Sequence, residues 1–386
     1  MTTPQIAIAG AGFAGLAAAR QLARLARSEA DIHLFDRHAF TTMIPALPDV
    51  AGGRLDPNRV RADIAAMTKP GIRVHIETVQ NIDLDKKELT TADSKFAFDF
   101  LILATGAAAD TRGLQQPPLD AAHTLATFDD ANRIRQDFTA FVQARSAPTA
   151  VVVGGGYTGL ELACNLKSLA AQHGKAARVI VVEMKDTILA GLPEKIRSYL
   201  EAQGRRQGLE MATGMRVTEF DGANVTLSNG SRLEDVFFCW STGTRRTLPA
   251  LHGEHREIPD GRILVDEFLR IPQHPQTFVA GDAAAILVKD VPLRKAVNFA
   301  YYSGLAAGRN VLKSLRGQPL RPFRPVDLGW VIPFGQTAAG QALGIDFLKG
   351  RLPLAMHYAM CGYRNFSRRH QLYFAGIAMR ALFGRL

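Results

Sequence analysis

Short runs of uncharged apolar residues recur along the chain, and each is followed by glycine or ends at an acid. The run at 5–9 leads into a glycine turn at 10–15 and an Ala/Leu/Arg-rich stretch to about residue 27. A second apolar run, 32–35, ends at Asp36. Continuous apolar runs are typical of strands that are buried on both faces. The pattern predicts a βαβ unit at the start of the chain.

The same pattern returns once. An apolar run at 150–153, a glycine turn at 154–159, a helical stretch at 160–171 and a run at 179–182 ending at Glu183 repeat the first unit. Two such units predict an α/β fold with two Rossmann-like dinucleotide-binding domains.

Further apolar runs indicate that the second domain is inserted in the first. The run 100–104 opens into Thr105-Gly106 before a crossover at 107–118, and 277–280 leads into Gly281-Asp282 and a helix at about 294–315. The expected domains are 1–110 with 255–335, the inserted 111–254, and a mainly helical, membrane-associating C-terminal region at 336–386.

Each glycine turn has the spacing G-x-G-x-x-G, which suits the pyrophosphate of a dinucleotide. The first glycine allows a tight turn, the second lets a phosphate approach the backbone, and the third lets the helix pack on the strand. Free N–H groups at the helix N-terminus face the phosphates, and an acid ending the second strand binds ribose hydroxyls. Gly10, Gly12 and Gly15 with Asp36 have every part of this pattern.

The second turn differs in its acid. A carboxylate at Glu183 favours free ribose hydroxyls and repels a 2′-phosphate, so it favours NADH over NADPH. Lys175 and Lys185 lie near in sequence and leave NADPH open.

The pair Gly281-Asp282 has two interpretations. The aspartate could cap the next helix, or it could hydrogen-bond a polyol chain. Beside Thr105-Gly106 and two dinucleotide motifs, it indicates flavin.

An ordered set of motifs runs from residue 1 to about 320: AGAGFAGLAAA, LILATGA, VVVGGGYTGLELA, STGT and FVAGDAAA. The set resembles the pyridine nucleotide–disulfide oxidoreductase superfamily. The resemblance implies an FAD site made by Gly10, Gly12, Phe13, Ala14, Gly15, Asp36, Arg37, Thr105, Gly106, Gly281 and Asp282. It also implies an NAD(H) site made by Gly154, Gly156, Tyr157, Thr158, Gly159, Glu183 and Gly243.

The branch of the superfamily follows from residues 40–57. Disulfide reductases carry a cysteine pair there, and this chain has none. Two segments are instead similar to type II NADH dehydrogenases: FTTMIPALPDVAGGRLDP at 40–57 and TGLELA at 158–163. That resemblance implies that Glu161 lies where nicotinamide and quinone meet the flavin. The alternative is an ordinary helix acid that complements the helix dipole.

The helix expected at 294–315 departs from that family. Asn298 and Tyr302, with Phe299 between them, occupy the positions where the family usually carries two glutamines that line a quinone tunnel. Arg294 and Lys295 at the helix start could direct positive charge at the flavin, with Lys295 in a catalytic role. Alternatively, they are two solvated basic residues.

The formal charge is +10, and the segment 351–386 holds six arginines and no acid. Its arginines alternate with aliphatic and aromatic residues, which is typical of an interfacial membrane helix. The alternative is a helical pair packed on its own domain or on a homodimer partner. No motif supports nucleic-acid binding. No signal peptide or spanning segment is expected, so we expect a cytoplasmic protein, peripheral on the inner face of the cell membrane.

These features together predict an FAD-dependent NADH:quinone oxidoreductase that does not pump protons and uses a membrane quinone. A sulfide:quinone oxidoreductase would need two cysteines beside the flavin, and Cys164, Cys239 and Cys361 are far apart in sequence. The same spacing leaves no metal or disulfide framework. A soluble reductase of a ferredoxin or rubredoxin, and a flavin-binding NADH sensor without turnover, stay open. Removing 351–386 is expected to release the enzyme from membranes and leave NADH oxidation by the flavin intact.

Overall fold

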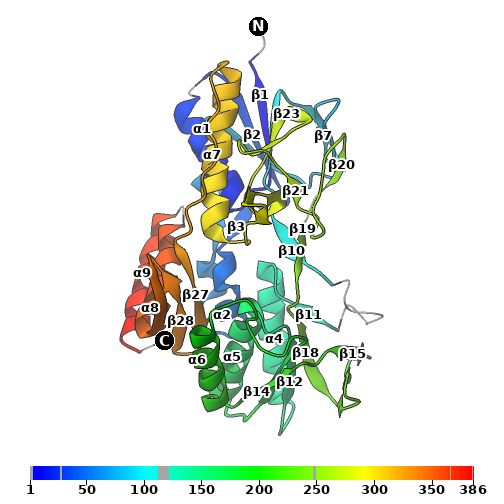
Figure 1. Cartoon of the computed structure of the whole chain (residues 1–386), viewed down its shortest axis with the longest axis vertical. Coiled ribbons are helices and arrows are strands. Elements are labelled where there is room, and N and C mark those ends of the chain that lie inside the picture. Colours follow the sequence, from blue (N-terminus) through cyan, green and yellow to red (C-terminus); the bar gives the residue numbers. More distant parts are fainter. Residues whose placement is uncertain (1–2, 27, 112–120, 247–248, 366, 385) are drawn as a thin grey trace. The chain divides into compact units, whose positions relative to one another are not determined.

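The computed structural model describes residues 3–26, 28–111, 121–246, 249–365, 367–384 and 386. The chain forms two compact units, coloured along the sequence in Figure 1. Unit 1 comprises Met1–Thr41, Ala62–Ala108 and Thr244–Asp327, and unit 2 comprises Thr42–Arg61, Ala109–Gly243 and Leu328–Leu386.

Unit 1 is built on a six-stranded sheet in the order β22-β23-β9-β1-β2-β5. Its strands are parallel except for β22. They are β1 (Gln5–Ala9), β2 (Asp31–Asp36), β5 (Ile72–Ile76), β9 (Phe100–Leu103), β22 (Arg270–Ile271) and β23 (His274–Val279). The long helices are α1 (Phe13–Leu25) and α7 (Val297–Leu315). A smaller sheet holds β6 (Asn81–Asp83), β7 (Glu88–Thr90), β8 (Lys95–Ala97) and β20 (Ala250–His252).

Helices α1 and α7 lie side by side (Figure 1) and approach unusually closely. A Cβ added at Gly304 would lie 2.1 Å from the carbonyl oxygen of Ala14, and one added at Gly308 would lie 2.9 Å from that of Ala18. Only glycine fits at the first position, because real Cβ atoms do not approach backbone oxygen so closely. These two glycines of α7 therefore allow the backbones of the two helices to touch.

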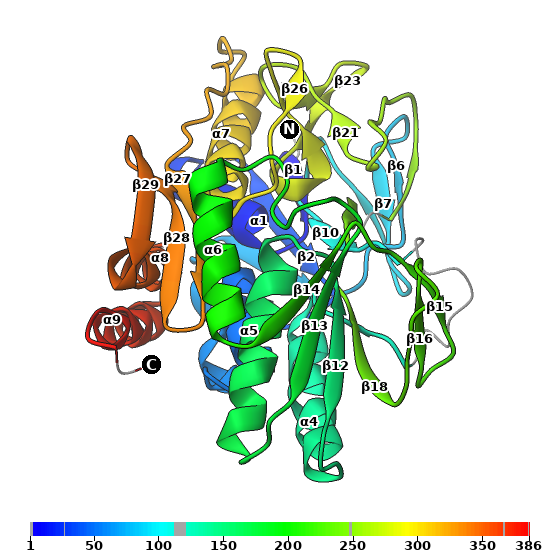
Figure 2. The ribbon, with the colours of Figure 1, turned by 60° about the horizontal axis from the view of Figure 1, so that its bottom comes forward.

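Unit 2 has a five-stranded parallel sheet in the order β11-β18-β12-β13-β14, with α5 beside it in Figure 2. The strands are β11 (His123–Thr124), β12 (Thr149–Val153), β13 (Arg178–Glu183), β14 (Leu209–Thr213) and β18 (Val236–Trp240). The helices are α2 (Leu47–Ala51), α4 (Phe128–Gln143), α5 (Tyr157–Gln172) and α6 (Glu194–Arg206). A small antiparallel sheet is formed by β15 (Val217–Phe220), β16 (Val225–Leu227) and β17 (Arg232–Leu233).

The C-terminal part of unit 2 is a three-stranded antiparallel sheet followed by two helices that pack on each other (Figure 2). These elements are β27 (Gly329–Phe334), β28 (Thr337–Ala342), β29 (Ile345–Gly350), α8 (Arg351–Tyr363) and α9 (Arg368–Leu382). Within the described ranges, every helix is too short or too polar to cross a membrane.

The predicted α/β fold with two dinucleotide-binding folds is confirmed: the chain leaves unit 1 after Ala108 and returns at Thr244. The helix expected from 294 begins only at Val297, because Ala296 is still extended at φ −161°. The three-domain division at 110/111, 254/255 and 335/336 stays a prediction. Parts of two predicted segments lie outside the described residues: Phe366 and Arg385 of the tail, and 112–118 of the crossover.

A histidine pair joins two strands of unit 1. His33 on β2 is buried, shares a 2.9 Å hydrogen bond with His75 on β5, and packs 4.4 Å from the ring of Phe96 between centroids. Burial first, and then repulsion by His75 and Arg73, lowers the pKa of His33 from 6.5 to about 4.

This pair predicts an acid-labile sheet. Because the folded pKa of His33 lies below the unfolded one, the unfolded chain takes up the proton first. The contribution of neutral His33 to the free energy of unfolding is therefore fully present above pH 6.5, and it is lost as the pH falls to about 4. The loss should reach about 3 kcal/mol. Urea unfolding across that range should show a smaller loss for His33→Gln than for the wild type. Equal losses would exclude His33 as the titrating group.

Candidate functional site

The first glycine turn, between β1 and α1, is shaped by contacts that exclude side chains at two of its three glycines. Gly10 has φ +101°, and a Cβ there would lie 2.4 Å from the carbonyl oxygen of Ala104. A Cβ at Gly15 would lie 1.7 Å from the oxygen of Gly10, whereas one at Gly12 would meet nothing within 4 Å. The backbone is therefore open at Gly12, where a pyrophosphate would approach the first N–H groups of α1.

The acid at the end of β2, Asp36, is hydrogen-bonded to the backbone of this turn. Asp36 Oδ2 accepts a 2.7 Å hydrogen bond from the N–H of Ala11, and Oδ1 accepts one of 2.9 Å from the N–H of His38. Arg37 is exposed and donates to the ring of His38. The predicted partners of a ribose thus lie directly beside the predicted pyrophosphate position.

The third FAD motif lies against the same turn. The N–H of Gly281, at φ +69°, donates to Ser303 Oγ on α7 at 2.9 Å, and a Cβ at Gly281 would lie 3.0 Å from Ala14 Cβ. Burial raises the pKa of Asp282, although Lys295 and Arg262 oppose the shift. Within the described part of the chain, no donor is hydrogen-bonded to the Asp282 carboxyl. Such a partly buried carboxyl group fits a hydroxyl-rich ligand such as a ribityl chain.

The polar residues near the start of α7 make hydrogen bonds and ion pairs with other residues of unit 1. Lys295 Nζ donates to the carbonyl and hydroxyl oxygens of Thr244 at 2.9 and 2.8 Å, and burial lowers its pKa. Arg294 pairs with Asp327 at 2.6 Å, and Asn298 Nδ2 donates to the carbonyl of Val326 at 2.6 Å. Phe299 is buried, and Tyr302 packs edge-on against Tyr301. Thr105-Gly106 follows β9, with Gly106 at φ +74°. Whether these side chains meet a flavin or a quinone stays a prediction.

The second glycine turn, in unit 2, repeats the first in detail. Gly154 has φ +111°, a Cβ at Gly159 would lie 1.9 Å from the oxygen of Gly154, and one at Gly156 would meet nothing within 4 Å. Glu183 accepts hydrogen bonds from the N–H groups of Gly155 at 2.7 Å and Lys185 at 2.9 Å. The turn is thus open at its second glycine, as a dinucleotide requires.

Two further predicted NAD(H) contacts flank this turn. Tyr157, the first residue of α5, lies 5.6 Å between ring centroids from Trp330 on β27, and Thr158 beside it is exposed. Gly243 follows β18 with φ +67°. Their contact with a nicotinamide cofactor remains a prediction.

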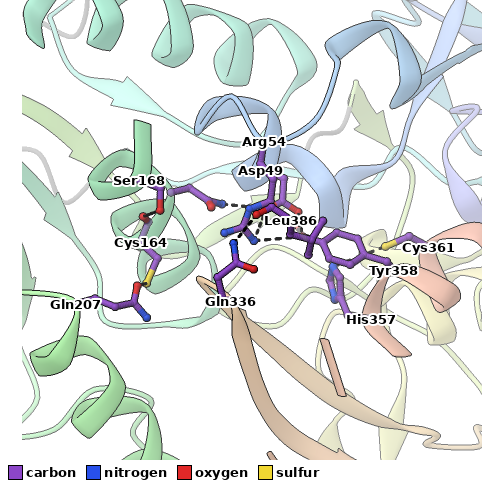
Figure 3. Close-up of polar contacts among 11 residues, drawn as sticks. Asp49, Arg54, Cys164, Ser168, Gln207, Gln336, His357, Tyr358, Cys361 and Leu386 are labelled. Carbon is purple, nitrogen blue, oxygen red and sulfur yellow. Dashed lines mark hydrogen bonds and ion pairs between the residues drawn. The ribbon is translucent and has the colours of Figure 1, made fainter. Parts of the chain in front are cut away.

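A buried polar cluster, not expected from the sequence, brings together α2, α5 and α8 of unit 2 (Figure 3). Asp49 Oδ2 accepts a 2.8 Å hydrogen bond from the hydroxyl of Tyr358, which is fully buried. Asp49 Oδ1 lies 3.4 Å from the guanidinium of Arg54 and accepts a 3.2 Å hydrogen bond from Asn165. We call Asp49, Arg54, Asn165 and Tyr358 the Asp49 cluster.

Glu161 borders the Asp49 cluster from the second turn of α5. Burial and the charge of Asp49 raise its pKa well above the usual value, although Arg54 opposes the shift. The side chain keeps some solvent exposure, and no described residue is hydrogen-bonded to its carboxyl. Burial also lowers the pKa of His357, on α8, to about 4. The surroundings of Glu161 therefore favour its neutral form over its charged form.

The three cysteines are free and buried, and burial raises the pKa of each thiol. Cys361 Sγ lies 3.7 Å from His357 Nε2, and Cys164 Sγ donates to Gln207 Oε1 at 3.4 Å. Thiols that stay protonated are poor nucleophiles. Among the described residues, no group of three or more His, Cys, Asp or Glu side chains could hold a metal ion.

The comparisons with known proteins agree with this geometry. An NADH dehydrogenase-like protein of Mycobacterium tuberculosis is 29% identical over 353 residues, covering 87% of this chain and 86% of its own. The type II NADH:quinone oxidoreductase of the same organism is 29% identical over 315 residues, covering 73% and 67%. The structure of NDH2 from Plasmodium falciparum in complex with NADH has the same fold, with a TM-score of 0.83 at 15% identity over 100% and 99% of the two chains.

A family model settles the relationship. The model for pyridine nucleotide-disulphide oxidoreductases matches residues 4–304, which include both glycine turns and the Gly281-Asp282 motif. The chain is thus an oxidoreductase that belongs to the pyridine nucleotide-disulphide oxidoreductase family.

Proposed function

We propose that this protein is an FAD-dependent NADH:quinone oxidoreductase with the balanced reaction NADH + H⁺ + quinone → NAD⁺ + quinol. The observation that carries the proposal is the pair of glycine turns, one in each unit, both open at the second glycine. A chain with two such turns can hold two dinucleotides at once, as electron transfer between them requires. Bound FAD would supply the redox chemistry, accepting a hydride and passing on two electrons.

The residues of this chain would bind and orient the two dinucleotides. In unit 1, the backbone at Gly12 would hold the FAD pyrophosphate, Asp36 a ribose, and Asp282 the polyol chain. In unit 2, the backbone at Gly156 would hold the pyrophosphate of NADH, with its adenosine ribose at Glu183. These roles follow from the open backbone and the acids described above.

Two proteins similar to this chain are named as quinone reductases, which supports a quinone as the electron acceptor. One is the type II NADH:quinone oxidoreductase of Mycobacterium tuberculosis, and the other is the demethylphylloquinone reductase of Synechocystis, 26% identical over 96% of this chain. Reducing a quinone consumes one proton from the medium. Sulfide as donor is disfavoured because buried, protonated thiols cannot readily attack sulfur.

The C-terminal helices support association with an anionic membrane surface. Arg351, Arg368, Arg369 and Arg380 are exposed, whereas Arg364 is buried. The large apolar side chains that are more than a third exposed in the described part of this segment are Leu352, Met360, Tyr363, Leu372, Met379, Leu382 and Phe383. Exposed apolar and cationic groups together favour an interfacial helix. We propose a peripheral protein on the inner face of the cell membrane, with a homodimer as the alternative use of this surface.

An acceptor screen tests the function. The FAD-loaded protein should oxidise NADH with a short-chain quinone, and sulfide should not replace NADH. Absorbance at the NADH and flavin bands follows both reactions. Bleaching of the flavin by sulfide alone would favour a sulfide:quinone oxidoreductase. Turnover only with ferredoxin or rubredoxin would favour a soluble reductase.

Glu183 should set the preference for NADH. Glu183→Gln keeps one oxygen to accept from the N–H of Gly155, and it removes the charge together with the acceptor for the N–H of Lys185. Without repulsion of a 2′-phosphate, kcat/KM for NADPH relative to NADH should rise about fivefold or more. Steady-state kinetics with both nucleotides measures the ratio. An unchanged ratio would show that another group selects the nucleotide.

A further inference from the structure

The residue that follows β13, Met184, has its backbone anchored on both sides. Before it, the carbonyl of Glu183 accepts a 3.0 Å hydrogen bond from the N–H of Met215. After it, the carbonyl of Lys185 accepts one of 2.9 Å from the N–H of Gly214. Both donors lie in the segment that follows β14, the strand paired with β13. The position of Met184 at this edge of the sheet is therefore fixed by backbone contacts within unit 2.

The side chain of Met184 is the most exposed methionine that the structure describes. It is 69% exposed, against 54% for Met379 and 39% for Met360, and the remaining described methionines are buried or half-buried. Methionine usually fills gaps in a core, so exposure on a fixed backbone is not explained by packing. Single exposed apolar side chains are nevertheless common. The meaning of this one depends on what lies beside it.

Met184 directly follows the acid that we assign to the adenosine ribose of NADH. In a dinucleotide-binding fold, the pyrophosphate lies at the helix N-terminus and the ribose at the acid that ends the second strand. The adenine ring is bonded to that ribose, so it extends beyond Glu183 over the end of β13. A thioether makes favourable contacts with aromatic rings. Met184 is thus placed where its sulfur can pack against the adenine.

The two glycine turns differ at this position. In unit 1, Asp36 is followed by Arg37, which is exposed and donates to the ring of His38 at 3.1 Å. In unit 2, Glu183 is followed by Met184. A guanidinium can also stack on an aromatic ring, but peroxides oxidise a thioether and leave a guanidinium intact. The NADH turn therefore carries an oxidisable group at a position where the FAD turn carries none.

We propose that Met184 is an oxidation-sensitive contact for the adenine of NADH, and that its conversion to the sulfoxide weakens binding of the nucleotide. The inference rests on the proposed function and adds regulation of its electron input. A peroxide supplies the oxygen: an S–O bond forms as the O–O bond breaks. The sulfur of Met184 loses two electrons, and hydrogen peroxide is reduced to water. The three cysteines compete poorly for the peroxide because all of them are buried.

The size of the effect follows from the contact that is lost. A sulfoxide is polar and chiral, so it no longer offers an apolar sulfur to the adenine. Loss of a sulfur–aromatic contact corresponds to binding weaker by about threefold to tenfold. The pyrophosphate and ribose contacts at Gly156 and Glu183 do not involve the thioether. Oxidation should therefore raise the KM for NADH and change kcat at saturating NADH little.

Peroxide treatment of the FAD-loaded enzyme tests the inference. Peptide mass spectrometry should show one added oxygen atom on Met184 before Met360 and Met379 are oxidised. The KM for NADH with a short-chain quinone should then rise by about threefold to tenfold, and NADH fluorescence should report binding weaker by the same factor. A methionine sulfoxide reductase should reverse both changes. Flavin content should stay constant. Oxidation of Met184 without weaker NADH binding would overturn the inference.

Three variants assign the effect to this side chain. Met184→Leu keeps an apolar group without sulfur, so peroxide should not change its KM, whatever the starting value. Met184→Gln imitates the polarity of the sulfoxide and should raise the KM without peroxide. Met379→Leu is the matched control and should keep the full response to peroxide. A response that persists in Met184→Leu would also contradict the inference. Peroxide-sensitive NADH binding without quinone turnover would instead overturn the proposed function and support the role of Met184.

Discussion

Gly12→Ala should give a folded protein that purifies without flavin, and Gly156→Ala should give a flavin-loaded protein that NADH reduces poorly. Both glycines have negative φ, at −75° and −82°, so alanine fits the backbone without strain. A Cβ at either position meets no protein atom within 4 Å. The methyl group would occupy the position where we place each pyrophosphate. We expect affinity for the affected dinucleotide to fall about 100-fold, close to 3 kcal/mol.

The readouts separate cofactor loss from unfolding. Circular dichroism should match the wild type, while bound FAD and the rate of NADH oxidation change in one variant each. Gly376→Ala on α9 is the control, since its Cβ also meets nothing within 4 Å and lies outside both turns. Gly15→Ala should instead misfold, because its Cβ would lie 1.7 Å from a backbone oxygen. Full flavin content in Gly12→Ala would remove the basis for placing FAD there.

Deleting residues 351–386 should unfold unit 2, contrary to the clean release from membranes expected from the sequence. The segment contains Leu354, Tyr358, Phe374 and Ile377, each at most 1% exposed. Each such side chain contributes roughly 2 kcal/mol of burial. Their joint loss approaches the whole stability of a domain, about 5–15 kcal/mol. Thermal unfolding and the solubility of the truncated protein measure the effect, and a soluble, cooperatively folding product would contradict it.

Surface substitutions test the membrane proposal without that damage. Arg369, Leu372 and Phe383 are exposed, so the triple variant Arg369→Gln, Leu372→Ser, Phe383→Ser should fold normally. Its partition to anionic liposomes should fall about 100-fold or more, from lost apolar burial and one lost charge. Ile76→Ser, which changes an exposed apolar residue outside the tail, is the control. Unchanged sedimentation of the triple variant would favour the homodimer use of this surface.

The sequence predicted both glycine turns and their strands because these signals are local. Each turn, its helix and its acid lie within one βαβ unit, and the structure reproduces their strands within a residue or two. The start of α7 was placed three residues too early, because basic residues near a helix start do not reveal where the backbone becomes helical. The extended φ of Ala296 shows that the helix begins at the next residue, Val297.

The Asp49 cluster could not be predicted because its members are remote in sequence. Asp49 and Tyr358 are separated by 309 residues, and Asp49 and Asn165 by 116. An aspartate in LPDVAGG and a tyrosine in an arginine-rich tail look exposed when each is considered alone. Only the packing of α2 and α8 in unit 2 buries both. The sequence of the arginine-rich tail likewise does not reveal that Arg364 is buried and that its helices supply core.

The close contact of α1 with α7 also orders events during synthesis. Helix α1 ends at Leu25, and its backbone partner, with Gly304 and Gly308, leaves the ribosome almost 300 residues later. At 5–20 residues per second, that is a delay of roughly 15 to 60 s. Strands β11 to β18 of unit 2 form a continuous stretch, His123–Trp240, and are complete well before then. The first helix to be translated can thus pack on β1 and β2 long before its closest helical partner, α7, is made.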